Sequence, residues 1–167
     1  EEQKTAANLR QSAKNALKVW LSEKIDNTFF TTLATSPSAG RVLFGGDATA
    51  TAEIVDADKL TTTLISTAKR KAMLATPKIR PVKIDGKEHY MMLVHPYAAR
   101  DLKTDTAWLN AQKDANLRGD KNPIFSGALG IWDGVILFEH ENVRLTTDGA
   151  SSANVAWNTL LGAQAGV

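Results

Sequence analysis

The sequence predicts an α+β fold in which a central, mostly antiparallel sheet is flanked by helices. Three segments carry this prediction: an unbroken helical pattern at residues 5–34, a hairpin pattern at residues 79–94 and a strand pattern at residues 135–141. The order along the chain is a long helix, a second helix, a hairpin, a third helix, a loop, a strand and a tail. We find no internal repeat and no low-complexity segment.

The first helix is the strongest of these predictions. Residues 5–34 contain neither Gly nor Pro, and apolar side chains recur at intervals of three and four, which places them on one stripe of a helix. The stripe comprises Leu9, Ala13, Ala16, Leu17, Trp20, Leu21, Ile25, Phe29 and Leu33. Such a helix would be about 45 Å long, longer than a small domain is wide. We therefore expect Leu17, Trp20, Leu21 and Ile25 to be buried against the rest of the chain or a neighbouring copy.

Residues 36–40 are rich in turn formers and end this helix. Residues 41–44 are interpreted as a short strand. A second helix is expected from Asp56 or Asp58, either of which can cap it, to about Ala75. Its inward side chains would be Leu60, Leu64, Ala68 and Ala72.

Asp85-Gly86 separates residues 79–84 from residues 87–94, and this dipeptide supplies the positive torsions of a two-residue hairpin turn. A third helical segment is expected at residues 97–113, with a break near Thr104 where Asp105 can cap a fresh turn. Residues 116–130 are expected to form a loop, and Asp133-Gly134 to turn the chain into the strand at 135–141. We expect that strand and 87–94 to share one sheet, with the helices packed on it. The tail from residue 155 fits either helix or strand.

Composition sets limits on function. The 167 residues are 43% hydrophobic and 23% charged, which is ordinary for a globular protein. A net charge of +2 does not require a nucleic-acid partner, and the lack of cysteine excludes disulfides and thiolate chemistry. No apolar run is long enough to span a bilayer, so no membrane partner is expected. The chain runs from Glu1 to Val167 and is interpreted as an incomplete fragment of a longer one.

The sequence predicts no enzyme, and no catalytic, cofactor or metal site. His89, His95 and His140 fall at no recognised ligand spacing. On a strand, Glu139 and Glu141 would point to the face opposite His140. Ser126 lacks the preceding Gly of a nucleophile elbow, and the glycines from Gly127 onward lack the Lys-Ser/Thr ending of a phosphate loop.

A basic cluster supports an alternative function. It comprises Lys69, Arg70, Lys71, Lys78, Arg80 and Lys83. These residues could contact nucleic-acid phosphates, although no aromatic side chains are interleaved to stack on bases. A solvated helix end is the simpler interpretation, and a nucleic-acid-binding module remains the alternative.

Several long motifs point to a family. They are YMMLVHPY at residues 90–97, DLKTD at 101–105, NPIFSGALGIWDGV at 122–135, EHENV at 139–143 and LLGAQA at 160–165. Together they resemble the major capsid proteins of tailed bacteriophages and prophages. The resemblance runs over most of the chain from Leu9 and is densest after Pro77.

This resemblance implies a capsid fold made of a peripheral domain with a long spine helix and an axial domain with a central sheet. Residues 1–40 would be the spine helix and residues 41–167 the axial domain. The implied function is structural: copies of the protein would assemble as pentamers and hexamers into an icosahedral shell that encloses double-stranded DNA. The implied location is the virion capsid and, during assembly, the cytoplasm of the bacterial host.

Two surfaces are predicted to serve that role. The loop residues Lys121, Asn122, Pro123, Ile124 and Phe125 would contact a neighbouring subunit, as loops on rigid scaffolds often do. Lys69, Arg70 and Lys71 would face the packaged DNA and contact its phosphates without reading sequence.

Overall fold

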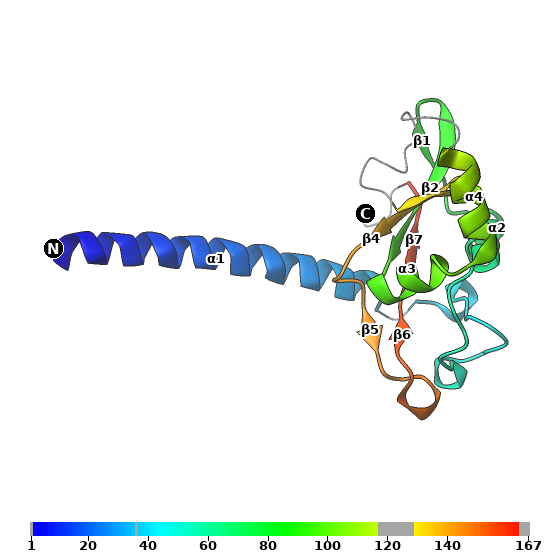
Figure 1. Cartoon of the computed structure of the whole chain (residues 1–167), viewed down its shortest axis with the longest axis horizontal. Coiled ribbons are helices and arrows are strands. Elements are labelled where there is room, and N and C mark those ends of the chain that lie inside the picture. Colours follow the sequence, from blue (N-terminus) through cyan, green and yellow to red (C-terminus); the bar gives the residue numbers. More distant parts are fainter. Residues whose placement is uncertain (1, 36, 117–128, 164–167) are drawn as a thin grey trace.

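The computed structural model describes residues 2–35, 37–116 and 129–163. One long helix, α1 (Glu2–Leu33), extends away from a body that holds the other elements (Figure 1). The helical prediction for residues 5–34 is thus confirmed. The helix does not lie along the body, however, and only its C-terminal end meets it.

The body is organised around a mixed sheet. Its strands are β1 (Val82–Ile84), β2 (Lys87–Val94), β3 (Gly130–Trp132), β4 (Val135–Glu139) and β7 (Thr159–Leu161). The order is β1-β2-β4-β3, with β7 also paired to β2. The expectation that the segments 87–94 and 135–141 share one sheet is confirmed, although the second strand ends at Glu139. The two lie side by side in parallel, and the other pairings in this sheet are antiparallel.

Two tight turns join β1 to β2 and β3 to β4. Asp85 and Gly86 have φ of 49° and 78°, and Asp133 and Gly134 have φ of 48° and 75°. Such consecutive positive torsions match the right-handed twist of the flanking strands, and Asp tolerates them better than most residues. Both Asp-Gly turns are therefore confirmed.

Helix α2 (Thr62–Leu74) begins later than expected. Its N-cap is Thr61, whose Oγ1 accepts a hydrogen bond from the Leu64 amide at 3.3 Å. Asp58 does not cap it, because its carboxylate accepts instead from the Val55 amide at 2.9 Å and closes a local turn. The expected strand at residues 41–44 is also wrong: a 3₁₀ turn (Ala39–Arg41) leads into a segment without strand structure, where Lys71 Nζ donates to the Val42 carbonyl at 2.7 Å.

The third helical segment is divided, as expected. Helix α3 (Pro96–Leu102) is followed by α4 (Thr106–Asn116), and Asp105 Oδ1 accepts from the Ala107 amide at 2.9 Å at the start of α4. Short 3₁₀ turns occur at Thr51–Glu53 and Ala150–Ser152. The described part of the tail, which ends at residue 163, contains strands: β6 (Val155–Ala156) pairs with β5 (Leu145–Thr146), and β7 joins the main sheet.

The core lies between one face of the sheet and the helices. Alternate residues of β2 and β4 point into it, and they meet α2, α3 and α4 there, which confirms that the helices pack on the sheet. Its largest fully buried side chains are Ile65, Val94, Leu102, Val135 and Leu137. Leu60 and Ala72 are buried as expected, while Leu64 is only partly so.

Candidate assembly surfaces

The apolar stripe of α1 is exposed in the isolated chain. Leu9, Leu17, Trp20, Leu21 and Ile25 retain 66%, 63%, 58%, 53% and 59% of their accessible surface. The expectation that these side chains are buried against the rest of the chain is therefore wrong for the residues described. The other half of that expectation, burial against a neighbouring copy, stays a prediction.

The apolar row also winds around α1. From Leu9 through Leu21 to Leu33, the larger apolar side chains follow one another mostly every fourth residue, with Ala13 in the same row. Four residues exceed one helical turn by about 40°, so the row winds by about 240° over that length. A single flat surface cannot cover such a row. The row is therefore not confined to the single stripe expected from the sequence.

The contact between α1 and the body begins at Phe30. Residues 8–29 are exposed, whereas Phe30 is half-buried and Ala34 is 6% exposed. The Phe30 ring stacks on the His140 ring, with centroids 4.4 Å apart and planes 26° apart. Phe29, which was placed on the apolar stripe in place of Phe30, is 51% exposed and touches Phe30 edge-on.

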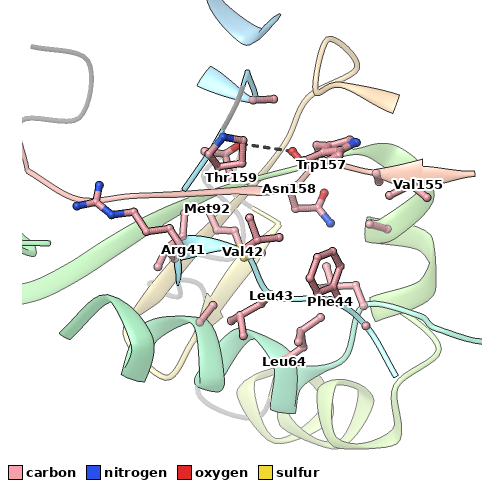
Figure 2. Close-up of a pocket in the computed structure, with 18 of the residues that line it drawn as sticks. Arg41, Val42, Leu43, Phe44, Leu64, Met92, Val155, Trp157, Asn158 and Thr159 are labelled. Carbon is pink, nitrogen blue, oxygen red and sulfur yellow. Dashed lines mark hydrogen bonds between the residues drawn. The ribbon is translucent and has the colours of Figure 1, made fainter. Parts of the chain in front are cut away.

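A cavity of about 590 Å³ opens beside this junction (Figure 2). Residues 41–44 form one wall, and Leu64 and Met92 contribute to the apolar lining. Two of its polar lining groups have partners: Asn158 Oδ1 accepts from the His95 amide at 2.9 Å, and Lys71 Nζ donates to the Val42 carbonyl. The arrangement lacks a nucleophile paired with a base among the residues described.

His95 and His140 each accept a local backbone hydrogen bond. His95 caps α3, because its Nδ1 accepts from the Tyr97 amide at 3.2 Å, and burial lowers its pKa while nearby Glu139 opposes that shift. His140 Nδ1 accepts from the Asn142 amide at 3.1 Å. Across the described parts of the chain, no three His, Asp or Glu side chains are grouped to hold a metal ion.

Comparison with known proteins decides the family. The model of a family described as phage capsid protein matches residues 1–166. The chain belongs to the phage capsid protein family. It is 28% identical to the major capsid protein of Pseudomonas phage KPP25 over 188 aligned residues, which cover 91% of this chain and 49% of that protein.

Solved capsids have the same fold. The capsid of Ralstonia phage GP4 superposes with a TM-score of 0.73 at 28% identity, over 92% of this chain and 52% of that one. The capsid asymmetric unit of cyanophage Pam1 superposes with a TM-score of 0.64 at 25% identity, over 80% of this chain and 46% of that one. This capsid protein chain thus spans about half the length of the relatives it matches, and the capsid fold expected from its motifs is confirmed.

The three basic residues expected to face DNA differ in their exposure and bonding in this capsid protein. Lys69 Nζ lies 2.8 Å from Asp133 Oδ1, and Lys71 is half-buried against the Val42 carbonyl, whereas Arg70 is exposed. The expected subunit-contact loop, residues 121–125, lies outside the described residues, so its role stays a prediction. None of the described helices has the length and hydropathy to cross a membrane.

Proposed function

We propose that this chain is part of a major capsid protein whose copies assemble, as pentamers and hexamers, into an icosahedral shell around double-stranded DNA. The exposed apolar row of α1 is the observation that carries this proposal. Five large apolar side chains on one unsupported helix are each more than half exposed. Large apolar side chains exposed in this number on one helix favour an interaction site over a solvated helix.

The energetics favour assembly through many copies. Full burial of a large aliphatic or aromatic side chain contributes about 1.5–3 kcal/mol, so each contact made by the row is modest. Closed symmetry repeats the same contact in every subunit, and multivalency turns weak contacts into a stable shell. A net charge of +2 on the chain also leaves little long-range repulsion between neighbouring copies.

The division of the chain follows the change in burial at Phe30. We place residues 1–40, which hold α1 and its exit, in a peripheral domain, and residues 41–167 in an axial domain. The support is that exposed helix gives way to buried contacts only at the C-terminal end of α1. The role of this chain is structural rather than enzymatic, in keeping with its family.

The proposed location is the virion capsid, after assembly in the cytoplasm of a bacterial host. Contact with packaged DNA would be non-specific. Among the three basic residues at 69–71, Arg70 is the best placed for it, because Lys69 and Lys71 have partners within the body.

Electron microscopy of the expressed full-length protein tests the proposal. Closed shells of uniform diameter are the expected result, with sedimentation showing a discrete large species. A protein that stays monomeric at high concentration would contradict it. A nuclease-treated sample run in parallel separates shell formation from aggregation on nucleic acid.

A further inference from the structure

The junction between α1 and the body holds two independent contacts. One is the stacked pair Phe30 and His140. The other is Arg144, whose Nη1 donates to the Ala34 carbonyl at 3.4 Å and whose guanidinium lies 5.2 Å from the ring centre of Trp157. We propose that these side chains form a two-point clamp that fixes the direction of α1, and that Arg144 and His140 are its positioning residues.

The body's half of the clamp is rigidly held. The His140 amide donates to the Val94 carbonyl at 3.0 Å, which fixes His140 to the end of β2, and the Asn142 amide bonds to its Nδ1. The Trp157 amide donates to the Arg144 carbonyl at 2.9 Å, and its indole Nε1 donates to Thr146 Oγ1 at 3.2 Å. Both contact points are therefore fixed to strands.

Two separated points constrain a helix more than one does. Phe30 lies one turn before Ala34, so the stack and the Arg144 hydrogen bond act at different positions along the axis. A single contact would leave the helix free to pivot about it. With both in place, a change in the direction of the helix axis must break the ring contact or the hydrogen bond to the Ala34 carbonyl just beyond the end of α1.

The length of α1 magnifies any change at the clamp. The helix has 32 residues. At 1.5 Å per residue it is about 48 Å long, so a pivot of about 10° would displace its far end by about 8 Å. The consequence for assembly rests on the proposed function: the clamp would determine where the apolar row of α1 meets its partner.

Spin labels measure the direction of α1 directly, because the chain has no native cysteine. Nitroxides on Ser12→Cys in α1 and Thr63→Cys in α2 report one distance across the clamp; both sites are exposed. The parent chain should give a single narrow distance distribution. Phe30→Ala should broaden or shift it by about 5 Å, the displacement of Ser12 for a pivot of about 10°.

Phe29→Ala is the matched control, since it removes the same ring from the neighbouring, exposed position. It should leave the distribution unchanged, while His140→Leu and Arg144→Ala should broaden it from the body's side. Circular dichroism confirms that α1 remains helical in every variant. A parent distribution as broad as that of Phe30→Ala, or equal effects of the two Phe substitutions, would overturn the clamp. The distance measurement uses the monomer, so it is independent of the test for shells. The clamp could be absent in a protein that forms shells, and it could be present in a protein that forms none.

Discussion

Asp105 ties the beginnings of two helices together, because one of its carboxylate oxygens accepts from both the amide and the hydroxyl of Thr62, each at 2.8 Å. Thr62 is buried at the first turn of α2, and Asp105 precedes α4. The other oxygen bonds to the Ala107 amide. One carboxylate thus accepts hydrogen bonds from the first turns of two helices, and Thr62 lies 43 residues before it in the chain.

Replacing Asp105 by Ala should lower the free energy of unfolding by about 0.5–2 kcal/mol, the usual effect of removing a cap. The buried Thr62 amide and hydroxyl would also lose their acceptor. Urea unfolding followed by circular dichroism measures the change. Asp56→Ala, at an exposed position, is the control and should be nearly neutral.

The stabilisation by the Asp105 carboxylate should depend on pH. The hydrogen bonds from Thr62, chiefly from its amide, lower the pKa of Asp105 below its usual 3.8, against a smaller effect of burial. Its stabilisation is therefore fully present above about pH 4 and is lost as the pH falls through the folded-state pKa. The deficit of an Asp105→Asn variant relative to the parent should shrink in that acid range. A constant deficit down to the lowest pH at which the protein folds would show that the charge is not responsible.

His95 has a dependence of the same sign, at a pH nearer neutrality. Burial lowers the pKa of His95 below 6.5, with Glu139 opposing the shift. As the pH falls through 6.5, the unfolded chain takes up a proton that the folded chain resists, so stability decreases on acidification. His95→Asn keeps an acceptor at the start of α3 and removes the titration. Between pH 7.5 and 5.5 its stability should fall less than that of the parent; an identical fall would contradict the assignment.

Local signals predicted most of the fold. The two Asp-Gly turns and the Asp105 cap depend on the conformational preferences of a few adjacent residues, so sequence sufficed. The predicted start of α2 was wrong, because the Asp58 carboxylate accepts a hydrogen bond from the Val55 amide instead of capping the helix. The parallel pairing of β2 with β4 joins segments more than forty residues apart, which no local pattern specifies.

The assembly surfaces were harder to predict. Nothing local to Phe30 distinguishes it from Phe29, because its role depends on His140, more than a hundred residues away. The exposure of the α1 row also follows from the placement of the whole helix. The family, in contrast, was evident from long motifs that needed no three-dimensional information.

The core should be sensitive to truncation. Leu137 is completely buried at the centre of the sheet, where β4 is flanked by β2 and β3. Leu137→Ala should lower the free energy of unfolding by about 2–5 kcal/mol, since it removes apolar contacts and leaves a cavity. Thermal unfolding of the isolated chain measures this. A loss below about 1 kcal/mol would mean that the sheet can close around the vacated space.

Leu21 should separate folding from assembly. Its side chain is 53% exposed in the isolated chain, so Leu21→Ala should change the monomer's stability by less than about 0.5 kcal/mol. If the α1 row is covered when shells form, the same substitution should reduce shell yield, because every subunit loses the same contact. Leu74→Ala is the control: Leu74 is 77% exposed on α2, outside the row. A monomer destabilised by several kcal/mol would place Leu21 against its own body, and full shell yield would show that the row stays uncovered in the capsid.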